Sequence, residues 1–156
     1  MKERTMQIIF TAGLFLFCST AMGTSPVLLD FDMTGRPFAE GNEPGYTSWA
    51  VGETSGSVSK TVDGITFTLS RNGGAGTGIK SAYYKAGVQA PNYARLIGDA
   101  LYVVDGDAGA GIRLTISGLS AGSHTLQSYH NAIDGKQHGN ISISVNGTAV
   151  KNSQPQ

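Results

Sequence analysis

The sequence is poor in cysteine, charge and aromatic residues, and each shortage narrows what the protein can be. It has 1 cysteine in 156 residues, 14% of its residues are charged, and 8% are aromatic. Acidic and basic residues number 11 each, so no excess of charge favours nucleic acid as a partner. Because one cysteine cannot form a disulfide within the chain, an apolar core must hold the fold, aided at most by an ion.

Residues 1–23 have the order of a secretory signal peptide. Lys2 and Arg4 precede an apolar run over residues 8–18, and small residues follow as far as Gly23. The run is shorter than the roughly 20 apolar residues of a membrane span. We therefore expect cleavage after Ala21 or Gly23, a secreted or periplasmic protein, and no membrane partner afterwards. An uncleaved N-terminal anchor is the alternative.

Residues 112–131 organise the rest of the chain. Ile112, Leu114 and Ile116 alternate with polar residues, which predicts a strand with one apolar face. A second strand is expected from about Ser123 to His130, as the antiparallel partner of the first. A loop with an aromatic ring and polar groups follows it, and such loops commonly carry binding sites.

Turn signals and further alternating runs complete the pattern. Residues 65–69 and 141–145 alternate, and the pairs at 63–64 (Asp-Gly) and 146–147 (Asn-Gly) predict tight hairpins. Residues 105–109 are also expected to form a hairpin turn. About seven strand candidates lie between residues 27 and 150, which predicts an all-β antiparallel sandwich over residues 24–156. The chain stops soon after the final hairpin, so we expect a last strand or strands to be missing.

Two carboxylates follow the first mature strand. Asp30 and Asp32 are two residues apart, on the same side of an extended chain. They are candidates for a structural calcium site at the sheet edge. Capping of the following turn is the favoured alternative, because calcium takes six or more oxygens and only two are visible locally.

Aromatic and hydrogen-bonding residues at the expected strand ends are candidates for ligand binding. Aromatic rings stack on the apolar faces of sugars, and polar groups contact hydroxyls. For Trp49 a place in the core is the favoured alternative, and the tyrosines could equally cover the end of the core. The candidates are Trp49, Tyr83, Tyr84, Tyr93, Arg95, His130, Asn131 and Asp134.

An ordered set of motifs resembles the galactose-binding-like or malectin-like β-sandwich modules. The motifs lie at residues 28–32, 43–49, 64–67, 96–99, 116–126 and 145–147. Such modules often stand at the N-terminus of secreted bacterial polysaccharide lyases and glycoside hydrolases. The resemblance implies a jelly-roll sandwich that binds a polysaccharide or oligosaccharide, with a catalytic domain following it in the full-length protein.

The expected function is therefore that of a non-catalytic carbohydrate-binding module. No nucleophile motif is visible, so we assign no catalytic residue. One alternative is a packing domain of a larger lyase or hydrolase with no ligand of its own. The other is an enzyme in which His130 acts as a base oriented by Asp134, and it lacks partner residues in the sequence.

Overall fold

The computed structural model describes residues 4–8, 14–15, 25–36, 41–83, 95–107, 109–130 and 140–154. Their regular structure consists of β-strands, which confirms the all-β prediction. None of these residues forms a helix long and apolar enough to cross a membrane. The strands are β1 (Arg4–Ile8), β2 (Leu14–Phe15), β3 (Leu29–Asp30), β4 (Thr47–Ser48), β5 (Ser57–Val62), β6 (Ile65–Asn72), β7 (Gly78–Tyr83), β8 (Asp99–Val104), β9 (Gly111–Ser117), β10 (Gln127–Ser128), β11 (Ile141–Val145) and β12 (Thr148–Gln154).

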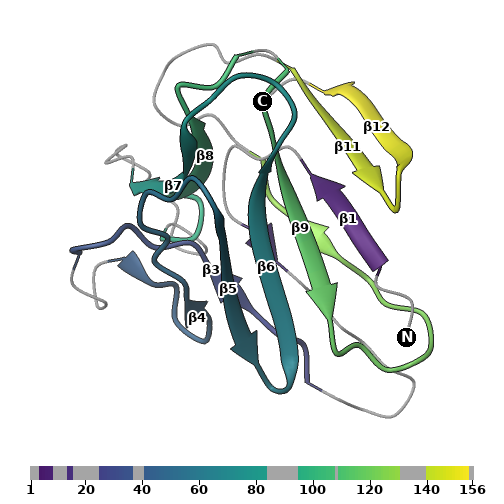
Figure 1. Ribbon diagram of the computed structural model, residues 1–156. Helices are drawn as coiled ribbons and strands as arrows, with labels where there is room; N and C mark the ends of the chain where they lie inside the picture. The colour runs from purple at the N-terminus through teal and green to yellow at the C-terminus, as the bar shows by residue number, and fades with distance from the viewer. Residues whose placement is uncertain are drawn as a thin grey trace.

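One layer is a six-stranded antiparallel sheet with the order β12-β11-β1-β9-β6-β5 (Figure 1). In the pairing of β6 with β9, Phe67 lies opposite Ile116 and Leu69 opposite Leu114. All four side chains are buried, while the residues between them are more exposed. The period-two alternation of both strands is confirmed, and it gives this sheet one apolar face.

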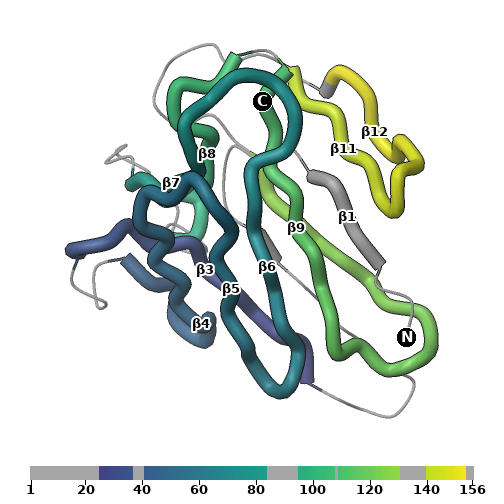
Figure 2. Tube along the Cα trace, viewed as in Figure 1, coloured from purple at the N-terminus to yellow at the C-terminus, as the bar shows by residue number. Residues whose placement is uncertain are grey.

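The second layer is built from shorter pieces. β7 pairs with β8 in antiparallel fashion, and β3 pairs with β4 in parallel. Residues 51–54 join the two pairs, because Ser81 N donates to Val51 O at 3.0 Å and Thr54 exchanges backbone hydrogen bonds with Ile79. The segment that carries β3 crosses behind β5 and β6 in Figure 2.

The core lies between these layers. Both contribute fully buried apolar side chains, and the second layer adds the paired rings of Phe31 and Trp49, whose centroids are 5.6 Å apart. The arrangement is consistent with a β-sandwich. The buried core cluster consists of Val27, Leu29, Phe31, Trp49, Val51, Phe67, Leu69, Ile79, Leu101, Ile112, Leu114 and Ile116.

Both tight hairpins form where the sequence predicts them. Asp63 and Gly64 have φ of 51° and 78° between β5 and β6. Asn146 and Gly147 have φ of 52° and 79° between β11 and β12. Two successive residues with positive φ match the right-handed twist of a two-residue hairpin, and Asn, Asp and Gly tolerate that conformation best.

Two predicted strand pairings are wrong. β9 pairs with β6 and β1, whereas β10 covers only residues 127–128 and pairs with β2, so the strands on either side of residues 118–122 are not partners. The turn at 105–109 links β8 of one layer to β9 of the other and is not a hairpin. In both cases nearness in sequence suggested the partner, whereas these strands pair with segments more distant in the chain.

β1 and β2 fall inside the segment assigned to a signal peptide. The backbone of β1 lies between β9 and β11, with Thr5 opposite Thr115 and Gln7 opposite Ser144. The cleavage of residues 1–23 stays a prediction, and it would take a central strand out of the sheet.

Candidate cation site

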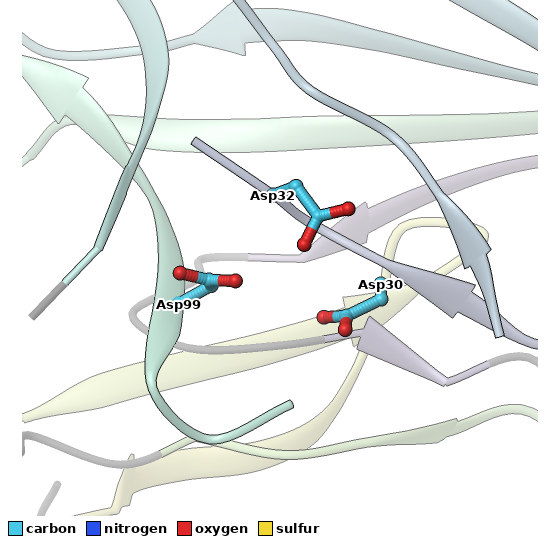
Figure 3. A group of neighbouring side chains, drawn as sticks. All are labelled: Asp30, Asp32 and Asp99. Carbon is cyan, nitrogen blue, oxygen red and sulfur yellow. The ribbon is translucent and has the colours of Figure 1, made fainter. Parts of the chain in front are cut away.

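Three aspartates from distant parts of the chain meet in the second layer. Asp30 ends β3, Asp32 follows it by two residues, and Asp99 begins β8. Each offers one carboxylate oxygen within 4.8 Å of the others, and Figure 3 shows the three groups turned toward a common space. The three residues are 0%, 5% and 0% exposed, respectively. The cluster is therefore closed off from bulk solvent.

The local folding explains why they converge. The parallel pairing of β3 with β4 holds the Asp30 backbone, since Trp49 N donates to Asp30 O at 2.7 Å. The Ser81 hydroxyl, on β7, donates to Asp32 O at 2.6 Å. Asp99 lies on β8 directly opposite Tyr83, at the end of β7. The pairing of β3 and of β8, together with the hydroxyl of Ser81 on β7, thus sets the positions of the carboxylates.

Most of these carboxylate oxygens have no hydrogen-bond donor. Asp30 Oδ2 accepts from the backbone N–H of Glu43 at 2.6 Å, and the backbone of Phe31 also hydrogen-bonds Asp30. Asp30 Oδ1 and both oxygens of Asp32 and of Asp99 are buried without a partner. Buried polar groups are nearly always paired, and an unpaired buried charge costs several kcal/mol by rough transfer estimates. Hydrogen bonds therefore leave most of these oxygens uncompensated, although the charge of Arg36 acts on Asp99.

Burial and mutual repulsion raise the pKa values of two of the three. Desolvation raises the pKa of Asp30 to about 7, and the hydrogen bond from the Glu43 backbone opposes this rise. The pKa of Asp99 rises to about 8 through desolvation, then through the charges of Asp30 and Asp32, while Arg36 opposes the rise. The contact between Asp32 and Asp99 becomes a hydrogen bond only when one of them holds a proton, because ionised carboxylates only accept.

A bound cation would offset the repulsion among the buried carboxylates without protonating them. The ligand set is entirely carboxylate oxygen, which suits calcium or magnesium rather than a soft metal. Calcium binds oxygen at about 2.3–2.6 Å, so opposite ligands stand about 4.6–5.2 Å apart, against about 4.2 Å for magnesium. The three oxygens lie within 4.8 Å of one another, which is compatible with the calcium sphere.

Two of the residues predicted to bind a ligand border this cluster. The ring of Tyr83 is partly buried, and the guanidinium carbon of Arg36 lies 3.2 Å from its centroid. Arg95 is exposed, and its Nη1 donates to Asn42 O at 3.3 Å. The cluster, Tyr83 and Arg95 therefore share one edge of the second layer.

The other predicted residues divide into three groups. Trp49 is 4% exposed and packs on Phe31, so its proposed role as a sugar platform is wrong and its core alternative is confirmed. His130 is partly buried, its Nε2 lies 2.9 Å from Ser128 Oγ, and burial lowers its pKa to about 4. Tyr84, Tyr93, Asn131 and Asp134 lie outside the described residues.

The favoured sequence interpretation of Asp30 and Asp32 also needs correction. Asp30 accepts from Glu43, thirteen residues on, rather than from the turn that follows it. Asp99 was missed, although it starts an apolar strand where a carboxylate has no obvious place. Asn42 was missed as well, and no local pattern marks it.

No protein-family model matches the chain, and no curated protein or solved structure matches it either.

Proposed function

We propose that this chain is a β-sandwich module that binds one calcium ion between Asp30, Asp32 and Asp99. One observation carries the proposal: the three buried carboxyl groups converge, and five of their six oxygens have no hydrogen-bond donor. With Arg36 acting on Asp99, an ion of charge +2 offsets the three negative charges locally. The ion has a structural role, because it joins β3, the segment at Asp32 and β8.

A catalytic role for the cluster is less well supported. Raised carboxyl pKa values often mark active sites, because a general acid must hold its proton near neutral pH. A catalytic group must also touch its substrate, and these three side chains are at most 5% exposed. A buried ion fits that geometry, whereas a substrate does not.

The second candidate function is glycan binding by an exported jelly-roll module, as the resemblance to galactose-binding-like domains implies. It is supported by Tyr83 and the exposed Arg95, which stand at the edge that the cluster organises. The rival role is a packing domain of a polysaccharide lyase or glycoside hydrolase. A glycan array probed with the full chain, in calcium and in chelator, separates the two: no bound glycan in either condition supports the packing role.

Thermal unfolding in calcium, in magnesium and in chelator tests the proposed ion. At a calcium concentration about one hundred times Kd, binding adds about 2.7 kcal/mol to the free energy of unfolding. For a chain of this size that raises Tm by about 5–10 °C. Magnesium should raise it less, because magnesium demands near-ideal octahedral geometry and gives up its water ligands reluctantly, whereas these side chains are closed off from solvent.

Asp99→Asn separates an ion site from an ordinary buried cluster. It keeps the shape and removes a carboxyl group whose ionisation burial opposes, so without calcium the variant should be at least as stable as the wild type, and its response to calcium should be lost. Asp63→Asn is the matched control, because Asp63 is an exposed turn residue whose conformation asparagine accepts. If calcium added to the chelated wild type leaves its Tm unchanged, the proposal is refuted.

A further inference from the structure

The loop of residues 41–46 is fastened to the carboxylate cluster. Glu43 N donates to Asp30 Oδ2 at 2.6 Å, and Tyr46 N donates to Glu43 O at 3.0 Å, which closes a turn. Gly41, at the start of the loop, lies so close to Asp32 that an added Cβ would be 3.0 Å from Asp32 Oδ1. The loop therefore touches two of the three carboxylates from the residues on either side of Asn42.

The side chain of Asn42 is oriented by its own hydrogen bonds. Its Nδ2 donates to Glu43 O at 3.0 Å and to Tyr46 O at 2.8 Å. Two carbonyl acceptors fix which end of the amide is nitrogen, because an amide oxygen cannot donate. Oδ1 is thus the remaining atom, and it is buried without a partner in a side chain that is 4% exposed.

A buried amide oxygen without a donor is the kind of group that calcium takes as a ligand. Calcium prefers six to eight oxygens and accepts asparagine carbonyls beside carboxylates. The three aspartates supply too few side chains for that number, and Asn42 is flanked by the two residues that contact Asp30 and Asp32. A neutral ligand also adds an oxygen without adding to the repulsion among the carboxylates.

We propose that Asn42 Oδ1 is a fourth side-chain ligand of the ion, so that calcium binding locks the loop of residues 41–46 over the site. This rests on the proposed calcium site. The loop is linked to the protein surface by Arg95, whose Nη1 donates to Asn42 O at 3.3 Å. Calcium then controls the position of an exposed cationic side chain at the edge where glycan binding is proposed.

Two measurements on the full chain test this ligand assignment. Isothermal titration with calcium should show that Asn42→Ala weakens binding by at least about tenfold, as lost metal contacts do. With Eu³⁺ in place of calcium, luminescence lifetimes in H₂O and D₂O should show more water on the ion in Asn42→Ala than in the wild type. Loss of loop hydrogen bonds alone would not open a coordination position to water.

Hydrogen exchange tests the lock itself. Amides of residues 41–46 should exchange more slowly with calcium in the wild type and show no such response in Asn42→Ala. Glu43→Gln is a control in the same loop: it keeps the backbone N–H that contacts Asp30 and removes only a side-chain charge that acts on Asp30, so residues 41–46 should still respond to calcium. Gly41→Ala is a second variant: its Cβ presses on Asp32 Oδ1, so calcium affinity should fall although Asn42 is intact.

The outcomes distinguish the two proposals. If the wild type binds neither calcium nor Eu³⁺, the proposed function fails. If the wild type binds both, and Asn42→Ala leaves the affinity, the hydration of Eu³⁺ and the exchange of residues 41–46 unchanged, the calcium site stands and the ligand role of Asn42 is overturned. If Asn42→Ala does not fold, Gly41→Ala is tested instead, and an unchanged calcium affinity in that variant overturns the proposed locking of the loop.

Discussion

Removal of one buried hydroxyl should destabilise the protein far more than its size suggests. Ser81 on β7 is fully buried, and its Oγ accepts from Val51 N at 3.0 Å and lies 2.6 Å from Asp32 O. It also lies 3.0 Å from Val51 O, which already accepts from Ser81 N. Since a hydroxyl has one proton, the short contact with Asp32 O is its donated bond.

Ser81→Ala therefore leaves two buried backbone groups without hydrogen-bond partners. The N–H of Val51 loses its acceptor and the carbonyl of Asp32 loses its donor. Each buried group left unpaired costs about 1–3 kcal/mol, so we expect a loss of about 3 kcal/mol in the free energy of unfolding. That corresponds to about 6–12 °C in Tm for a chain of this size. Calcium affinity should fall as well, because the Asp32 backbone loses its anchor.

Urea unfolding followed by tryptophan fluorescence measures this loss. Trp49 is the sole tryptophan and is 4% exposed in the core, so its emission reports global unfolding. Ser59→Ala is the control, because it makes the same chemical change at an exposed hydroxyl that lies 2.7 Å from Thr68 Oγ1. Exposed substitutions usually change stability by less than about 0.5 kcal/mol. A Ser81→Ala loss no larger than that of Ser59→Ala refutes the reasoning.

Three other changes test buried or closely packed positions. Burial lowers the pKa of His130 from 6.5 to about 4. Between these pH values only the unfolded chain takes up the proton, so the protein becomes less stable as the pH is lowered. His130→Asn should therefore lose less stability than the wild type between about pH 7 and about pH 4.5, as urea midpoints will show. Gly78→Ala should cost about 1–3 kcal/mol by thermal unfolding, because its Cβ would press on the Thr54 carbonyl. In a Cys18→Ser background, Thr5→Cys and Thr115→Cys should form a disulfide on oxidation, detectable by mass spectrometry, because they are partners across β1 and β9.

Each of these changes has its own control. Equal acid sensitivity of His130→Asn and wild type would show that the imidazole is not held neutral by burial. Gly52→Ala should be mild, since its Cβ would make only an ordinary 3.8 Å contact, and equal losses at positions 78 and 52 would contradict the close approach. Thr5→Cys with Thr61→Cys, on the far strand β5, should stay reduced.

Local patterns predicted the strands and turns because both are decided by neighbouring residues. The alternation of Phe67 with Thr66 and Thr68 needs only a buried face, and the hairpin at Asp63 and Gly64 needs only two residues that accept positive φ. Strand partners could not be read in the same way. Residues 112–116 alternate equally well whichever strand lies beside them, and the structure pairs them with β6 and β1.

The candidate site was only half visible in the sequence for a related reason. Asp30 and Asp32 attract notice because they stand close together, whereas Asp99 joins them only through the pairing of β7 with β8. Their burial could not be predicted from a strand end, where carboxylates are normally solvated. The sequence also did not determine whether Trp49 is buried or exposed, since an aromatic ring at a strand start suits either a core or a binding face.

Residues 4–8 form a central strand of the sheet and also lie in the segment predicted to be cleaved, and one chain cannot do both. As β1 they run antiparallel to both β9 and β11, so those two strands run parallel to one another on either side of it. Neighbouring strands lie about 4.8 Å apart, so loss of β1 leaves a gap of about 9.6 Å, which backbone hydrogen bonds cannot span. A chain cleaved after Gly23 must then move β11 and β12 onto β9 or accept another strand in the gap, because exposed strand edges recruit partners. The amides of residues 112–116 and 143–145, on the two strands beside β1, are therefore where a precursor and a processed chain should differ.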